Sequence, residues 1–424
     1  MTQQPKEQLF SKYQIFIIAI LAILQFTIIL DFMVLSPLGA ILMPKLGMKT
    51  DQFGLVVSAY AFSAGASGLL AAGFADKFDR KRLLMFFYTG FIMGTVLCAV
   101  APNYQFLLIA RIVTGLFGGV IGSISFAIIT DLFKMEVRGR VMGFVQMAFA
   151  ASQILGIPIG LVLANHFGWH APFWMIAGFG VLLGFVILMY MRPVSDHLSI
   201  QNDNNAFRHL TTTISKPEYI RAFIGTTLLA TGGFMLMPFG SAFGIHNIGL
   251  TMKQLPVLYG VTGIFSIIFG PLIGKLSDKI GKYKMFVIGS IISIIMVAIY
   301  TKLGVTPLWI VIALNVLLFV GISSRMISAS ALMTAIPKLQ DRGAFMSINA
   351  AVQQIAGGIA AYIAGKIVVE TSTGKIEHYD TLGYVVMGSM LVAIVLLYFI
   401  NAYVMKQPKV NLSATPSSEA LAEA

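Results

Sequence analysis

Apolar segments of about 20 residues recur along the whole chain, and they constrain the fold more than any other feature of the sequence. An α-helix of roughly 20 residues crosses the ~30 Å hydrocarbon core of a bilayer. Hydrophobic residues make up 57% of the 424-residue chain and charged residues only 11%, whereas roughly a quarter of an ordinary globular chain is charged. This composition excludes a soluble enzyme, a nucleic-acid-binding module and a disordered protein.

The apolar segments predict an all-α membrane protein with twelve transmembrane helices. The run 13–43 is too long for a signal-peptide core and has no small-residue cleavage site after it, so we expect a retained first helix. The other expected spans are 52–75, 83–101, 104–132, 139–164, 169–191, 218–246, 255–276, 284–303, 306–336, 342–366 and 381–405. Residues 1–191 and 218–405 are therefore expected to form two six-helix bundles, joined by a polar cytoplasmic linker, 192–217. The polar tail, 406–424, is expected to be disordered.

The basic residues predict the orientation of the chain in the membrane. Of the 29 Lys and Arg residues, two are intramembrane, Arg111 and Arg325. Six fall on the side opposite the termini: Lys45, Lys49, Lys253, Lys302, Lys366 and Lys375. The remaining 21 share the side of the termini and the linker. Because Lys and Arg concentrate in cytoplasmic loops, we expect a multi-pass protein of the inner or plasma membrane with both termini cytoplasmic.

The two halves of the sequence resemble each other. Three pairs of landmarks lie at nearly the same separation: Asp76 and Asp278 are 202 residues apart, Pro37 and Pro238 are 201 apart, and Arg138 and Arg342 are 204 apart. Repeats of this kind are typical of transporters that bind their substrate near the midplane, between the halves.

The loops carry a more specific resemblance. Segments 72–81 and 274–283 resemble the Gly-x-Leu-Ala-Asp-Arg-x-Gly-Arg-Lys loop of the major facilitator superfamily, although Ala72 and Asp79 stand where glycine is usual. Leu107, Arg111 and Gly115 are similar to the arginine motif of the family's fourth span. Gly156, Pro158 and Gly160 resemble the glycine–proline motif of its drug/proton antiporters, the 12-helix efflux branch. The resemblance covers residues 13–405 and implies a monomeric transporter.

Asp31 is the only acidic residue well inside an expected span. A charge at this depth costs about 2.5–3.5 kcal/mol on insertion scales, so it is expected to face the bundle interior or a water-filled cavity. Two interpretations are open. Asp31 is a carboxyl group that takes up and releases the coupling proton, or it is permanently ionised and fixed to a basic partner. The matching position in the second half is Gly232, which carries no acid.

Two intramembrane arginines are candidate partners of Asp31. Arg111 corresponds to the family's cavity arginine, and the resemblance implies that it responds to protonation of a nearby acid. The alternatives are a fixed ion pair or an arginine that reaches the outer interface. Arg325 matches no such arginine, because Arg111 aligns with Asn315. A guanidinium can bind carboxylate or phosphate through two hydrogen bonds, so Arg325 is expected to contact the substrate, to pair with Asp31, or to be satisfied by backbone carbonyls.

The remaining candidates form three groups. The resemblance implies a cytoplasmic gate. The alternative is that its basic residues only reflect the orientation of the chain in the membrane. The gate residues are Asp76, Arg80, Asp131, Arg138, Asp278, Lys282 and Arg342. Pro158 is expected to bend span 5, and the glycines to allow close helix packing. A third group consists of residues that could contact the substrate. The alternative is that they only pack or form hydrogen bonds between helices. These residues are Gln146, Gln153, Asn349, Gln353, Gln354, Phe32, Met33, Tyr60, Phe234 and Met237.

The function we predict is proton-coupled antiport that exports a small amphipathic compound by alternating access. The alternative is a sugar, organic-anion or other metabolite carrier of the same fold, in which Arg325 binds an anionic group. The sequence contains no HExxH, Gly-x-Ser-x-Gly or nucleotide-binding loop, so we do not expect an enzyme. The single cysteine, Cys98, cannot form a disulfide framework or a thiol-metal site, and the histidines lie in loops or at span ends. We therefore expect no metal and no cofactor, with a proton gradient as the energy source.

Overall fold

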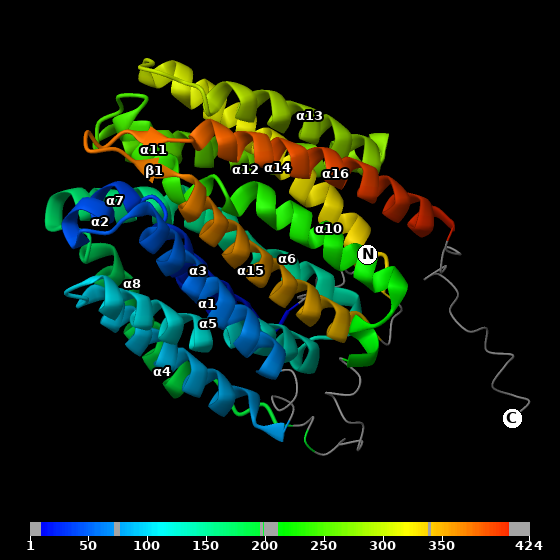
Figure 1. The fold of residues 1–424 in the computed structure, drawn as a ribbon. Helices are drawn as coiled ribbons and strands as arrows, with labels where there is room; N and C mark the ends of the chain where they lie inside the picture. The colour runs from blue at the N-terminus through cyan, green and yellow to red at the C-terminus, as the bar shows by residue number, and fades with distance from the viewer. Residues whose placement is uncertain (1–9, 72–76, 196–197, 199–210, 338–340, 407–424) are drawn as a thin grey trace, which may run out of the picture.

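The computed structural model describes residues 10–71, 77–195, 198, 211–337 and 341–406, and it is a bundle of long helices (Figure 1). The first half contains α1 (Lys12–Val34), α2 (Gly39–Leu46), α3 (Thr50–Ala71), α4 (Arg80–Ala99), α5 (Tyr104–Leu132), α6 (Met135–Ala151), the π-helix η2 (Ser152–Gly156), α7 (Ile157–Phe167) and α8 (Ala171–Tyr190). The second contains α10 (Pro217–Phe234), the 3-10 helix η4 (Met237–Phe239), α11 (Gly240–His246), α12 (Gln254–Ile280), α13 (Lys282–Tyr300), α14 (Leu308–Thr334), α15 (Arg342–Ile367), the strands β1 (Val369–Glu370) and β2 (Ile376–Glu377), and α16 (Tyr379–Lys406).

Ten helical segments of the described chain are long and apolar enough to cross a membrane. The segment α6–η2–α7 and helix α15 complete the twelve expected spans, so the predicted fold class is confirmed. The domain boundaries stay a prediction, because most of the linker and residues 407–424 lie outside the described residues.

The first span differs from the single helix expected over 13–43. The helix α1 ends at Val34 and the shorter α2 begins at Gly39. In the second half, α10 ends at Phe234 and the span continues through η4 and α11. Pro37 and Pro238 lie in these interruptions, where a residue without an N–H group cannot continue the helical hydrogen bonds. The two halves therefore share an interrupted first helix.

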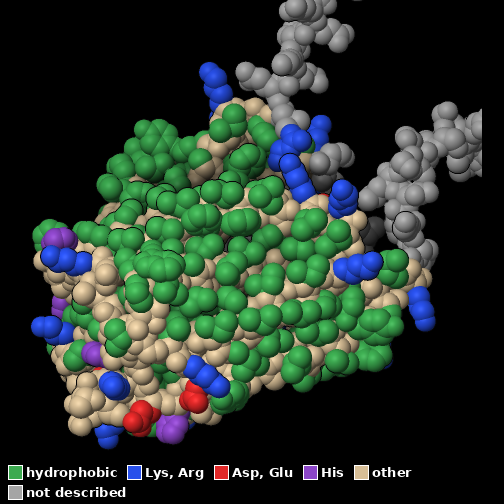
Figure 2. Space-filling model, turned by 90° about the horizontal axis from the view of Figure 1, so that it is seen from above, with side chains coloured by type: hydrophobic (Ala, Val, Ile, Leu, Met, Phe, Trp, Pro, Cys, Tyr) green, Lys and Arg blue, Asp and Glu red, His purple; other side chains and the backbone are tan. Residues whose placement is uncertain are grey.

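Apolar side chains cover the outside of the bundle. Figure 2 shows a broad apolar belt with Lys and Arg side chains at its two ends. On α13 and α16 the exposed side chains include Ile291, Ile295, Val392 and Val395. An apolar surface of this extent is too large for a soluble monomer and matches the hydrocarbon core of a bilayer.

The hydrophobic core is shared by the halves at one end of the bundle and divided at the other. We call the end with Lys12, Lys216 and Lys406 the terminal end, and the end with Lys49 and Lys366 the distal end. One buried cluster at the distal end joins residues of both halves, from Leu38 and Met43 to Phe243 and Leu382. Towards the terminal end, each half has its own cluster. The halves are thus sealed together distally.

Close contacts between α3 and α15 form part of the distal seal. The hydroxyl of Thr50 donates to the carbonyl of Val368 at 2.6 Å, and Lys366 Nζ lies 3.4 Å from Asp51 Oδ2. A Cβ atom on Gly54 would lie only 2.8 Å from the carbonyl oxygen of Ala361. Glycine at position 54 therefore permits the two backbones to approach.

Candidate functional site

Asp31 lies inside the protein near the end of α1. Its side chain is fully buried, in agreement with the expectation that it faces the bundle interior. Ser11 begins α1 with a capping box that includes Gln14, and the apolar helix then carries Asp31 about five turns into the bundle. The interruption before α2 follows three residues after Asp31. Asp31 therefore lies beside the break in the first span.

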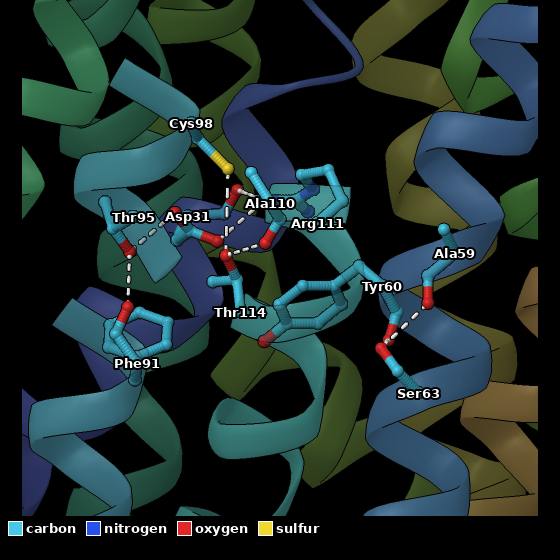
Figure 3. A network of polar contacts seen from close by, with 10 residues as sticks. All are labelled: Asp31, Ala59, Tyr60, Ser63, Phe91, Thr95, Cys98, Ala110, Arg111 and Thr114. Atoms are coloured by element: carbon cyan, nitrogen blue, oxygen red, sulfur yellow. Dashed lines mark hydrogen bonds and ion pairs between the residues drawn. The ribbon is translucent and has the colours of Figure 1, made fainter. Parts of the chain in front are cut away.

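Arg111 and Asp31 form a buried ion pair (Figure 3). Arg111 Nη1 lies 2.7 Å from Asp31 Oδ2 and 3.3 Å from the backbone oxygen of Asp31, and neither side chain is exposed. Asn103 caps the start of α5 by accepting from the N–H of Phe106, and Arg111 follows two turns later. Of the two candidate arginines, it is Arg111 that pairs with Asp31 in this structure.

Residues that the sequence did not single out complete the surroundings of Asp31. The hydroxyl of Thr95, on α4, lies 3.2 Å from Asp31 Oδ1 and 3.0 Å from the carbonyl of Phe91. Cys98 Sγ lies 3.7 Å from the hydroxyl of Thr114, which itself donates to the carbonyl of Ala110 at 2.6 Å (Figure 3). A hydroxyl inside an apolar span carries no sequence signal of its own, because it can always bond to its own helix.

Tyr60 covers the guanidinium of Arg111. The ring centre lies 4.5 Å from Arg111 Cζ, a distance at which a cation is attracted to an aromatic face. Tyr60 also packs against Phe32, with ring centres 5.1 Å apart, and Phe32 packs against Phe234 of the second half at 5.6 Å. Three predicted substrate-contacting aromatics thus form one cluster that connects the ion pair to the other half.

The guanidinium of Arg111 depends on Asp31 for most of its charge compensation. Arg111 Nε and Nη2 are buried and have no hydrogen-bond partner in the part of the chain that the structure describes, so Asp31 is the main compensation for its charge. Removing one partner of a buried pair costs about 3–5 kcal/mol, because the other charge remains uncompensated. Loss of the Asp31 charge would therefore leave a buried guanidinium without its counter-ion.

Arg325 lies in the second half, away from this pair. Its side chain is buried, and Nε and Nη2 have no hydrogen-bond partner among the described residues. Arg325 Cζ lies 5.6 Å from the centre of the Phe286 ring. The expected alternative in which backbone carbonyls satisfy these two nitrogens is therefore not seen.

The other predicted substrate-contacting residues are partly brought together. Met33 is buried next to Phe32, and Met237 is half-buried in the shared distal cluster. Asn349 accepts from the hydroxyl of Thr226 at 2.5 Å, which is a contact within the second half. The half-buried glutamines show no described hydrogen bond: Gln153, Gln353 and Gln354. The side chain of Gln146 lies outside the described residues.

The glycine–proline motif lies between the ion-pair helix and the other half. A Cβ on Gly156 would lie 2.5 Å from Leu30 Cδ1, and one on Gly160 would lie 2.8 Å from Val34 Cγ2, so α1 packs directly on these glycines. On α12, a Cβ on Gly260 would lie 3.6 Å from Pro158 Cγ. The π-helix η2 ends at Gly156, the first glycine of the motif, and α7 begins at the next residue. Pro158 therefore lies in the first turn of α7, where its missing N–H group is tolerated.

The predicted gate residues form contacts within each half. Arg80 Nε lies 3.0 Å from Asp131 Oδ2, joining α4 to α5. Arg138 donates to the carbonyls of Thr130 and Phe133, at 2.5 and 2.8 Å, at the end of α5. Asp79, which departs from the family's glycine, caps α4 by accepting from the N–H of Arg82.

In the second half, the described gate residues lie on the surface. Asp278 pairs with Lys282 on the surface, across the turn between α12 and α13. Asp76 and the side chain of Arg342 lie outside the described residues. The gating role of the whole set stays a prediction. Among the described residues, no group of three His, Cys, Asp or Glu side chains is placed to hold a metal ion.

Two related six-helix halves, an apolar belt and a buried ion pair define a multi-pass membrane transport protein. The family model of the Major Facilitator Superfamily matches residues 21–264 and 222–421, and the chain belongs to this superfamily. Its members are transporters and in general not enzymes. The match is to the superfamily as a whole and does not distinguish its branches.

Several relatives share part of this sequence. "Uncharacterized MFS-type transporter YceJ" of Bacillus subtilis (strain 168) is 30% identical over 66% of this chain and 71% of its own length. "Multidrug resistance protein 3" of the same organism is 31% identical, but over only 35% of this chain and 29% of its own.

Solved structures share the fold. A bacterial homologue of the human lysosomal transporter Spinster, in an inward-facing and occupied conformation, has a TM-score of 0.69 at 15% identity, over 93% of this chain and 97% of its own. A point mutant of the nucleoside transporter NupG also has a TM-score of 0.69 at 15% identity, over 91% and 99%.

Proposed function

We propose that this transporter is a proton-coupled antiporter that exports a small amphipathic compound. The buried pair of Asp31 and Arg111 is the observation that carries the proposal. Asp31 is a single carboxyl group inside the bundle, held by one arginine and one hydroxyl. Intramembrane acids of this kind mark proton pathways in pumps and transporters. The partial match to a protein named for multidrug resistance supports export.

Protonation of Asp31 would release Arg111 and so weaken the contacts of Tyr60 with Phe32. Because Phe32 contacts Phe234, the change reaches the seam between the halves. Substrate and proton would then bind to alternate states of the same cavity, and the halves would rock around it. The proton gradient supplies the energy, and no cofactor takes part.

We also propose the membrane and the orientation in which the protein works. We place the terminal end of the bundle in the cytoplasm, because 21 of the 29 Lys and Arg residues lie on that side. The protein would then span the inner or plasma membrane with both termini inside the cell. A monomer is sufficient, since one chain supplies both six-helix halves.

Proton movement in proteoliposomes tests the proposal. A preformed pH gradient is challenged with lipophilic cations, zwitterions, organic anions and sugars, with Asp31→Asn protein beside the unaltered chain. We expect at least one amphipathic compound to collapse the gradient with the unaltered protein only. Equal transport by both proteins without proton flux would contradict antiport and assign Asp31 a structural role.

A second candidate function is a sugar, organic-anion or other metabolite carrier. The unpartnered guanidinium of Arg325 favours it, because a buried cation suits an anionic substrate group. The same assay separates the two functions, since a facilitative carrier moves its compound without collapsing the gradient.

A further inference from the structure

Arg325 lies against the position that is occupied by an acid in the other half. In the first half, Arg111 on α5 reaches Asp31 on α1. In the second half, the residue that matches Asp31 is Gly232 on α10. A Cβ atom on Gly232 would lie 3.4 Å from Arg325 Nη1, which is ordinary contact distance. Arg325 therefore faces the position from which an acidic side chain would bind it, and glycine supplies none.

The two arginines are similar in their position in space and not in the sequence repeat, because Arg325 and Arg111 do not align with each other. Arg111 aligns with Asn315, which lies on α14 ten residues before Arg325. The two halves thus place a guanidinium against the same point of their first helix from different positions in the sequence. Only the first half also provides the carboxylate.

Arg325 has no ion pair among the described residues. The residue is 3% exposed, and two of its three nitrogens are buried without a described hydrogen-bond partner. Its neighbours are apolar: the ring of Phe286 on α13, and Met390, whose Cε lies 3.6 Å from the Cβ position of Gly232. Ser290 lies one turn after Phe286 on the same face of α13, and its hydroxyl is also buried without a partner. Two helices therefore carry unpartnered polar groups in this region.

We propose that Arg325 is an anion-binding residue and that the transported compound carries a carboxylate, which binds the guanidinium next to Gly232. The inference rests on the proposed transport function and names its substrate class: an amphiphile with one carboxylate group. A buried guanidinium without a counter-ion is unfavourable, and a carboxylate matches its paired N–H groups. Phe234, two residues further along α10, contacts Phe32 of the first half, so the site lies next to the seam between the halves.

Substitutions of Gly232 test the proposal without removing Arg325. Gly232→Asp supplies an internal carboxylate, Gly232→Asn is its uncharged match, and Gly232→Ala fits in ordinary contact. The probes are 4-phenylbutyrate and indole-3-acetate, each beside its amide, and binding is measured by thermal unfolding of the purified full chain. We expect the carboxylates to bind the unaltered, Ala and Asn proteins at least tenfold more tightly than the Asp protein. Without ligand, the Asp protein should unfold at a higher temperature than the Asn protein.

Three results would overturn the proposal. In the first, the carboxylates stabilise the unaltered protein no more than their amides do. In the second, the Gly232→Asp and Gly232→Asn proteins bind the carboxylates equally. In the third, the Gly232→Asp protein without ligand is no more stable than the Gly232→Asn protein. Proton flux in proteoliposomes is a separate readout. Proton antiport without any preference for acid over amide overturns the anion site and leaves the transport proposal standing. Preference for the acid without proton flux supports the anion site and overturns proton antiport.

Discussion

At the scale of single residues, the proposed function depends on Asp31 and its two polar neighbours. Asp31 accepts from Arg111 at 2.7 Å and lies 3.2 Å from the hydroxyl of Thr95. Arg111 is the charged partner of the Asp31 carboxylate. A substrate that displaced Arg111 would therefore leave a buried carboxylate without its counter-ion.

Thr95→Val should slow proton-coupled transport. The substitution removes the hydroxyl that lies 3.2 Å from Asp31 Oδ1. A hydrogen bond to a charged group is worth roughly 1.5 kcal/mol, which corresponds to about tenfold in rate. Initial rates of proton-coupled transport in proteoliposomes measure the loss. Thr95→Ser keeps the hydroxyl and should keep the rate; a Val rate equal to that of Ser would contradict the role of Thr95.

Tyr60→Leu should weaken coupling more than Tyr60→Phe. The ring of Tyr60 lies 4.5 Å from Arg111 Cζ and packs on Phe32, and phenylalanine retains both contacts. A cation over an aromatic face contributes about 2 kcal/mol when desolvated, or roughly 30-fold. The number of protons moved per substrate in proteoliposomes reports coupling. Equal loss in both variants would assign the effect to the hydroxyl instead of the ring.

At the scale of helices, glycines determine which surfaces can approach. The helix α1 packs on Gly156 and Gly160, and α3 packs on α15 through Gly54 and Gly365. An added methyl group at Gly54 would lie within 3 Å of two backbone atoms, which cannot move aside as a side chain can. The distal seal therefore depends on the absence of a side chain.

Gly54→Ala should prevent the distal end from closing and lower the transport rate more than tenfold. The matched control is Gly178→Ala in α8, where no atom of another described helix lies within 4 Å of the added methyl group. Alanine is favoured over glycine in a helix by about 1 kcal/mol, so the control should be at least as stable as the unaltered protein. Initial transport rates and thermal unfolding test both. Similar rates in the two variants would show that the close approach at Gly54 is unnecessary.

The sequence predicted the helices well because their signal is local. The expected span 104–132 has the same bounds as α5, and the repeat landmarks Pro37 and Pro238 both mark interrupted helices. The pairing of Asp31 with Arg111 was one of two options, since few charges lie inside the spans. Thr95 and the approach of Arg325 to Gly232 could not be predicted, because they depend on how each helix is rotated about its axis.

At the scale of the whole molecule, the halves share one apolar core distally and have separate cores towards the terminal end. Separation at the terminal end therefore needs little exposure of core residues, whereas distal opening must break the shared cluster. The structure represents a state that is sealed at the distal end. Alternating access requires that this seal open during each cycle.

A reversible distal cross-link should stop transport. Lys366 and Asp51 form an ion pair between the halves at 3.4 Å, so cysteines at both positions can be joined by a short bifunctional thiol reagent in a Cys98→Ser background. We expect transport to be lost after cross-linking and restored when a cleavable linker is reduced. Each single cysteine treated alike is the control. Transport by the fully cross-linked protein would contradict opening at this end.

Proton release upon substrate binding tests the central claim most directly. Purified protein in weakly buffered solution, with a pH indicator, is mixed with the compound identified in proteoliposomes. Coupling through Asp31 predicts proton release by the unaltered protein and none by Asp31→Asn protein, with the substrate still bound by both. Equal proton release by the two proteins, or none by either, would contradict the claim that substrate and proton are linked through Asp31.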